Sequence, residues 1–108
     1  MDERFASGSW HVKEGREQAF VDAWTDLIEW TAREHPAFIG ATLLRDQHDP
    51  RHFVSFARWT DEAARAAWKG SEGFASGHAA CRSFCDDFYG SDYDRSVEIS
   101  GAAALTTN

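Results

Sequence analysis

A chain of 108 residues, 43% of them hydrophobic and 14% aromatic, can build one modest core and has no room for a second domain. Its 18 acidic residues outnumber its 11 basic ones, and the resulting formal charge of -7 argues against nucleic acid or an anionic membrane surface as a partner. The sequence opens without a basic region followed by an apolar run and contains no stretch long enough to span a bilayer. We therefore expect a cytoplasmic protein with no membrane partner.

The first half of the chain predicts a strand, a helix and a hairpin. Residues 5–12 alternate with a period of about two, as a strand does. Apolar side chains recur at three- and four-residue steps over residues 15–35, which predicts the longest helix, ending before Pro36. Residues 38–46 and 52–59 follow as two strand-like runs on either side of a turn signal, and together they predict a hairpin.

The second half predicts an interrupted helix and a last strand. Thr60 is a candidate N-cap for a short helix to about Trp68, and the glycines of residues 70–73 interrupt that helix. Ser71 can cap a second helix, whose apolar stripe runs at steps of four and three residues, and residues 93–100 then alternate like a strand. The stripe comprises Phe74, His78, Cys81, Cys85 and Phe88.

The order strand, helix, strand, strand, interrupted helix, strand predicts an α+β fold of the ferredoxin-like βαββαβ type. Its antiparallel sheet carries both helices on one face. We expect residues 1–100 to form a single domain and residues 101–108 to form a C-terminal tail.

The uncovered sheet face predicts a homodimer. Neighbours in a strand point to opposite faces. The helices therefore cannot cover both Trp10 and Phe53 and the alternate set, Val54 and Phe56. Some aromatic surface would stay bare in a monomer, and sheet-on-sheet pairing of two copies would bury it.

His78 is the strongest candidate for chemistry. It lies on the apolar stripe one turn after Phe74, so it is either a hydrogen-bonded core histidine or a metal or heme ligand or a general base. Cys81 and Cys85 share its predicted face, but no further ligand pair is present to complete a zinc site, so we expect free thiols that act as small hydrophobes.

The five tryptophans exceed what a core of this size needs. Trp24 sits within the stripe of the first helix and is expected in the core. Trp30, at the edge of that stripe, and Trp68, beside the glycines, are candidates for lining a cavity for a flat aromatic ligand, with core packing or dimer contact as the alternative. His11 on the first strand points either into the same cavity or to solvent.

Residues 58–82 resemble a stretch typical of the antibiotic biosynthesis monooxygenase superfamily of small dimeric α/β-barrel proteins. The order of the predicted elements agrees with that superfamily over nearly the whole chain, including the Lys-x-Gly turn after the first strand and the strand that follows His35-Pro36. The matching positions are Trp59, Glu62, Ala63, Trp68, Ser71, Phe74 and His78.

The resemblance implies a dimer whose two sheets close into a barrel, with each cavity between sheet and helices. It implies a monooxygenase acting on a flat aromatic quinol or anthrone-like polyketide without flavin or metal. In that reading His78, or failing that His11, is the base, and Trp68, Phe74 and Trp30 line the substrate site.

Two alternatives stay open. Heme-degrading relatives carry a tryptophan ten residues before the histidine that ligates iron, and Trp68 and His78 reproduce this spacing, although Gly8 stands where those enzymes have an asparagine. The third possibility is a non-catalytic dimeric module that binds a small ligand, because one fold can carry many functions.

Overall fold

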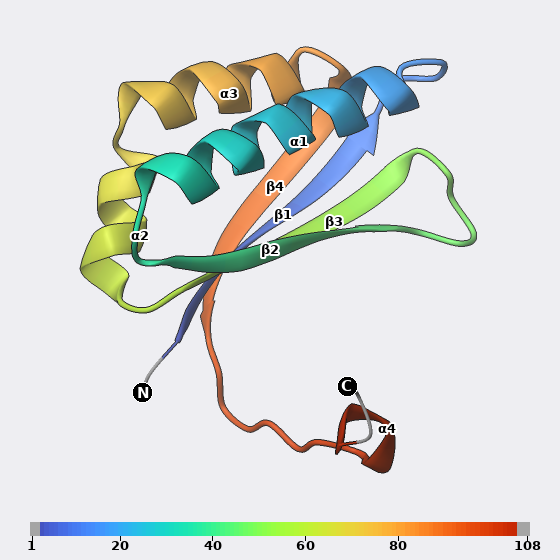
Figure 1. The fold of residues 1–108 in the computed structure, drawn as a ribbon. Coiled ribbons are helices and arrows are strands. Elements are labelled where there is room, and N and C mark those ends of the chain that lie inside the picture. Colours follow the sequence, from blue (N-terminus) through green and yellow to red (C-terminus); the bar gives the residue numbers. More distant parts are fainter. Residues whose placement is uncertain (1–2, 106–108) are drawn as a thin grey trace.

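A computed structural model of the protein describes residues 3–105 and confirms the predicted ferredoxin-like fold. Four antiparallel strands form one sheet in the order β2-β3-β1-β4, and the long helices lie side by side across one face of it (Figure 1). Within the described residues, no helix is both long and apolar enough to cross a membrane. The elements are β1 (Arg4–Val12), α1 (Glu17–Glu34), β2 (Phe38–Arg45), β3 (His52–Trp59), α2 (Glu62–Lys69), α3 (Glu72–Arg82), β4 (Cys85–Asp94) and the short α4 (Ala102–Leu105).

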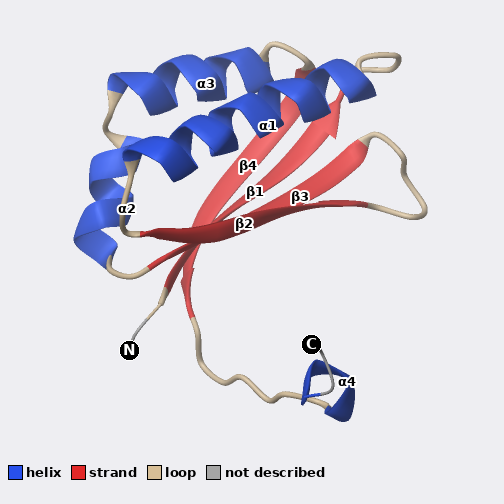
Figure 2. Ribbon diagram, viewed as in Figure 1, coloured by secondary structure: helices blue, strands red, loops and turns tan. Residues whose placement is uncertain are grey.

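The strands sort their side chains between the two faces by simple alternation. In β1, Trp10 and Val12 are buried beneath the helices, while His11 between them is exposed. In β3, Phe53 is buried on the same side and Phe56 lies on the other. The core therefore lies between the sheet and the layer formed by α1, α2 and α3, which Figure 2 shows on one side only.

The opposite side of the sheet, which we call the open face, is covered by no element of the described chain (Figure 2). Large side chains stand exposed on it: Leu44 is 50% exposed, Tyr89 71% and Tyr93 52%. Val54 and Phe56 lie between them on β3. The predicted bare aromatic surface is thus present in the single chain.

The end of the second helix and the last strand differ from the prediction. The helix α3 ends at Arg82 and β4 spans Cys85–Asp94, whereas the sequence suggested a helix through Phe88 and a strand over residues 93–100. The spacing of Cys85 and Phe88 fits either a helix or a strand. Strand pairing decides for the strand, because β4 completes the hydrogen bonding of the otherwise free edge of β1. Val97, in the segment expected to be a strand, is 75% exposed.

The start of α2 also differs by one residue. Asp61, not Thr60, is the N-cap, and its side chain accepts a hydrogen bond from the Ala64 backbone amide at 2.8 Å. Two other boundaries agree with the prediction, since Ser71 caps α3 and α1 ends at Glu34, followed by the C-cap His35, whose backbone is extended ahead of Pro36.

Beyond β4 the chain leaves the sheet as an extended arm that ends in α4, well away from the helices (Figure 1). Arg95 anchors the base of this arm through two hydrogen bonds of 3.2 Å to the Glu3 carboxylate. The predicted tail begins within this arm, and its residues 106–108 lie outside the described part of the chain.

Candidate active site

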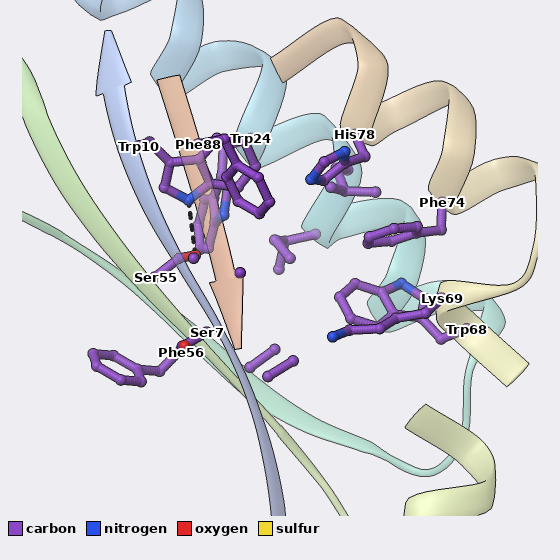
Figure 3. A pocket seen from close by; sticks show the side chains of 16 residues that line it. Ser7, Trp10, Trp24, Ser55, Phe56, Trp68, Lys69, Phe74, His78 and Phe88 are labelled. Carbon is purple, nitrogen blue, oxygen red and sulfur yellow. Dashed lines mark hydrogen bonds between the residues drawn. The ribbon is translucent and has the colours of Figure 1, made fainter. Parts of the chain in front are cut away.

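A cavity of about 350 Å³ lies between the sheet and the helices, and we call it the aromatic pocket. Its size falls at the lower end of the range for small-molecule sites. Most of the surrounding side chains are apolar, and several are aromatic (Figure 3). The lining residues are Ala6, Ser7, Gly8, Trp10, Trp24, Leu27, Ile28, Ser55, Phe56, Ala57, Trp68, Lys69, Phe74, His78, Phe88 and Gly90. Ser7 and Phe56 are cross-strand partners that also line the open face.

The floor of the pocket is made by small residues of β1, β3 and β4. Gly8 and Gly90 are partners across β1 and β4, and Ala6 and Ala57 are partners across β1 and β3. A Cβ atom on Gly8 would lie 2.7 Å from Nε1 of Trp10, closer than real contacts allow. The absence of a side chain at Gly8 therefore leaves room both for the Trp10 ring and for the cavity.

Trp68 and Phe74 form one wall, as expected for two of the predicted ligand contacts. Trp68 is 4% exposed, and its indole Nε1 donates a hydrogen bond of 2.9 Å to Oγ1 of Thr31 on α1. The Phe74 ring meets it edge-on with 4.5 Å between ring centroids. The orientation of Trp68, which the sequence left open, is thus fixed by a buried hydrogen bond.

The end of α2 and the start of α3 are joined so that both rings face the pocket. The Ser71 hydroxyl donates to the Trp68 carbonyl at 2.7 Å and accepts from the Phe74 amide at 3.2 Å. One short side chain therefore ties together the two helix termini that carry this wall.

Trp10 and Phe88 form the opposite wall, and sequence reasoning did not assign either of them to the site. Nε1 of Trp10 donates to Oγ of Ser55 at 3.0 Å, and the Phe88 ring lies 4.4 Å from that of Trp10. Trp24 also lines the pocket, although we expected it in the core. The alternation of β1, which placed Trp10 on one face with Gly8, was the signal that could have identified this wall.

His78 projects from α3 into the pocket between the two walls (Figure 3). Its ring lies 5.1 Å from Phe74 in a stacked arrangement, 4.7 Å from Phe88 and 5.3 Å from Trp10. Within residues 3–105 its ring nitrogens have no hydrogen-bond partner. The structure thus presents a free imidazole to the cavity rather than a hydrogen-bonded core histidine.

The surroundings keep that imidazole neutral. Burial lowers the pKa of His78 below its usual 6.5, and the positive charges of Arg82 and Lys69 lower it further. At neutral pH a ring nitrogen therefore carries a lone pair that can accept a proton or bind a metal.

Trp30 and His11, the other two predicted contacts, lie outside the aromatic pocket. Trp30 packs against His35, with a ring distance of 5.2 Å, and fills the space that Gly73 leaves by having no side chain. His11 lies on the open face and stacks on His52 at 4.6 Å. The strand period explains the second placement, because the neighbours of His11 are the ones that face the helices.

The cysteines do not join His78 in a ligand set. Burial raises the pKa of the Cys81 thiol to about 12 and that of Cys85 to about 11, so both thiols keep their protons. Cys85 lies in β4 rather than on the helix, and its Sγ donates to the Cys81 carbonyl. Among residues 3–105 no group of three or more histidine, cysteine or acidic side chains is arranged to hold a metal ion.

A family model described as antibiotic biosynthesis monooxygenase matches residues 5–80. The chain belongs to this family. The matched segment contains both walls of the pocket except Phe88, and it includes His78.

Solved structures of similar fold include further members of the antibiotic biosynthesis monooxygenase family. A variant of SnoaB, a cofactor-independent oxygenase from Streptomyces nogalater, superposes with a TM-score of 0.85 at 22% identity, over 94% of this chain and all of that one. A protein described as an antibiotic biosynthesis monooxygenase gives 0.71 at 22% identity, covering 89% of this chain and 99% of that one. A conserved protein from Methanosarcina mazei Go1 gives 0.77 at 19%, over 86% and 92%. At these identities the likeness shows the fold, and no curated protein matches the chain.

Proposed function

We propose that this protein is a small monooxygenase that oxidises a flat quinol or anthrone-like substrate with dioxygen, without flavin or metal. One observation carries the proposal: an imidazole without a hydrogen-bond partner faces an aromatic-walled cavity of about 350 Å³. Aromatic walls bind flat rings, and a neutral imidazole accepts the proton of an acidic phenol or anthrone.

Once the substrate is deprotonated, the reaction needs no further reacting group from the protein. His78 takes the proton, and the electron-rich anion passes electrons to dioxygen within the cavity. For an anthrone, the CH₂ group loses both hydrogens and gains one oxygen to become a carbonyl, while the second oxygen leaves as water. The substrate itself supplies the electrons for that water, so no external reductant is needed.

The pocket residues would then act by positioning and by excluding water. Trp68 and Phe74 on one side and Trp10 and Phe88 on the other can hold a ring system flat against the Gly8 floor. The fold of SnoaB, itself a cofactor-independent oxygenase, supports this assignment at the level of architecture.

We further propose that two copies pair through the open face. Leu44, Tyr89 and Tyr93 are half or more exposed there, and Phe56 is 39% exposed. A hollow of about 400 Å³ lies among side chains of β1, β3 and β4 on this face and offers space for those of a second sheet. Exposed apolar surface of this kind is typical of an interface.

Heme is the second candidate ligand, favoured by the unpartnered ring of His78. That nitrogen could hold the iron, which would then supply the oxygen chemistry. The rest of the pocket fits less well, because Phe74 stacks on His78 and Lys69, a cation that lines the pocket, is already paired with Asp92. A heme would have to displace these contacts.

Oxygen uptake tests the proposal directly. Purified protein is supplied with anthrone or 1,4-dihydroxynaphthalene, with a protein-free blank to subtract spontaneous oxidation. We expect uptake by the wild type, loss with His78→Gln, and no change with His48→Gln, which alters an exposed histidine in the β2–β3 turn.

A parallel hemin titration separates the alternatives. A saturable Soret shift that His78→Gln abolishes would replace the lead assignment by heme binding. Neither uptake nor a Soret shift, with quinols still raising the melting temperature, would favour a non-catalytic ligand-binding module.

A further inference from the structure

Lys69 places a charged side chain in a mostly apolar cavity. Among the residues of the described chain that line the aromatic pocket, it alone has a permanent charge. It is the last residue of α2, and its side chain is 35% exposed, which places it where the pocket meets solvent. Figure 3 shows it beside Trp68, on the pocket side of the helix.

Asp92, the present ion-pair partner of Lys69, also lies near a second cation. Nζ of Lys69 lies 2.5 Å from Oδ1 of Asp92, and the guanidinium of Arg65 lies 3.9 Å from the other oxygen of the same carboxylate. Arg65 is firmly held, since its side chain is only 10% exposed and it also donates to the Phe5 carbonyl. If Lys69 turned toward a ligand, Asp92 would keep a cationic neighbour.

Breaking the ion pair between Lys69 and Asp92 also costs little free energy. Both side chains are more than a third exposed, and ion pairs in that setting contribute little to stability. An ammonium on a flexible four-carbon stem can therefore change its partner at small cost when an anion enters the pocket.

From this arrangement we propose that the aromatic pocket selects a flat aromatic compound bearing a carboxylate, which binds Nζ of Lys69 while a ring hydroxyl faces His78. The inference rests on the proposed function and narrows its substrate class. Apolar walls bind a ring in many orientations, and a few polar groups fix one of them. Lys69 from α2 and His78 from α3 are two such groups, on either side of the Trp68 and Phe74 rings.

A carboxylate fits this site better than a phosphate does. One ammonium balances the single charge of a carboxylate, whereas a phosphate monoester carries nearly two charges and is usually met by several donors. No second cationic side chain lines the pocket in the part of the chain that the structure describes.

The test compares two ligands of the same shape that differ in charge. The probes are 1,4-dihydroxy-2-naphthoic acid and its carboxamide, titrated under nitrogen and followed by quenching of tryptophan fluorescence, since three tryptophans line the pocket. We expect the acid to bind the wild type about tenfold more tightly than the amide, as a hydrogen bond to a charged group implies.

Three variants assign that preference to Lys69. Lys69→Met keeps the length of the side chain and should reduce the acid to the affinity of the amide, while leaving the amide unchanged. Lys69→Arg should retain most of the preference. Lys13→Met removes the same charge from an exposed turn outside the pocket and should behave as wild type.

The inference is overturned if the wild type binds acid and amide equally, or if Lys69→Met keeps the preference. Oxygen uptake distinguishes this result from failure of the proposed function. Uptake with neutral 1,4-dihydroxynaphthalene but no acid preference would remove the inference alone. Acid preference through Lys69 without uptake on any quinol would remove the oxygenase and leave a carboxylate-binding pocket.

Discussion

His52, one of the two histidines on the open face, and His78, which α3 directs toward the covered face, have different surroundings. On the open face His52 lies in a hydrogen-bonded chain, 2.9 Å from Oγ of Ser9 and 3.1 Å from a carboxylate oxygen of Asp46. On the covered face His78 is surrounded by aromatic rings, with no such partner among residues 3–105. Both histidines are partly buried, but His52 is held in place by protein groups, whereas His78 is available to a ligand.

The same contrast extends to the apolar side chains. Under the helices they surround a cavity, and on the open face they stand at the surface. A perturbation of the covered face should therefore cost stability and ligand binding together. A perturbation of the open face should leave the fold intact and change only association.

The largest effect is expected from Trp68→Ala on the covered face. Removing a buried indole typically costs about 3–5 kcal/mol of unfolding free energy, and the pocket would lose one wall. Trp68→Phe, which loses mainly the hydrogen bond to Thr31, should cost only about 1 kcal/mol. Urea denaturation of both variants measures the difference, and equal costs would show that the ring contributes little beyond its hydrogen bond.

Gly8→Ala should come next. The added methyl group would press on Trp10, Phe88 and the Ser55 hydroxyl, and overpacking of this kind costs about 1–3 kcal/mol. Gly40→Ala in β2 is the control, because its nearest new contact is the flexible end of Arg58 at 3.4 Å. We expect the control to be neutral or slightly stabilising, and ligand quenching to be lost in Gly8→Ala only. Retained ligand binding in Gly8→Ala would contradict the assignment of Gly8 to the floor.

The titration of His78 should produce a smaller, pH-dependent effect. Its pKa is lowered in the folded state, so the neutral form stabilises the fold: that contribution is complete above the unfolded pKa near 6.5 and is lost as the pH falls through the folded pKa. The charges that act on it are Arg82 on α3 and Lys69 on α2, while β1 and β4 present the uncharged Trp10 and Phe88.

Urea denaturation between pH 5 and 8 should show this loss in the wild type and a flatter profile in His78→Gln. Lys69→Met should move the pKa of His78 back toward its usual value, measured by NMR of the imidazole protons. An unchanged pKa would mean that the lysine charge does not reach the ring.

Substitutions on the open face should have the smallest effect on unfolding. Leu44→Glu and Tyr89→Glu alter exposed side chains, so the unfolding free energy of the single chain should change by no more than about 0.5 kcal/mol. Sedimentation velocity should nonetheless show a dimer in the wild type and a monomer in the double variant. Val97→Glu, on the arm, serves as a control that keeps the dimer, and a wild-type monomer would refute the proposed pairing.

Periodicity and capping predicted most of the fold because each depends on neighbours in sequence. The long helix, the hairpin and the Ser71 cap are of this kind. The last strand was mistaken because Cys85 and Phe88 fit a helical stripe equally well, and only the free edge of β1 decides the matter.

The residues of the site also fall into two groups, those that sequence spacing predicts and those that depend on contacts between elements. His78 and Phe74 share a helical face, so their meeting could be predicted. Trp10 and Phe88 meet across two strands whose register the sequence does not reveal, and they were not assigned to the site. Trp30 was expected in the cavity and instead fills the space above a helical glycine, which depends on how α1 and α3 are set against each other.

The short break between α2 and α3 determines the direction in which the side chains of α3 point relative to those of α2. In one continuous helix, six residues of separation would turn Phe74 by about 240° relative to Trp68 and place the two rings on different sides. The Ser71 clamp instead resets the helix so that the rings lie 4.5 Å apart. The number of residues in this junction is therefore constrained together with the identity of Ser71. Deleting Gly70 would rotate α3 by about 100° and carry His78 out of register with the cavity, although every residue that lines the cavity would still be present.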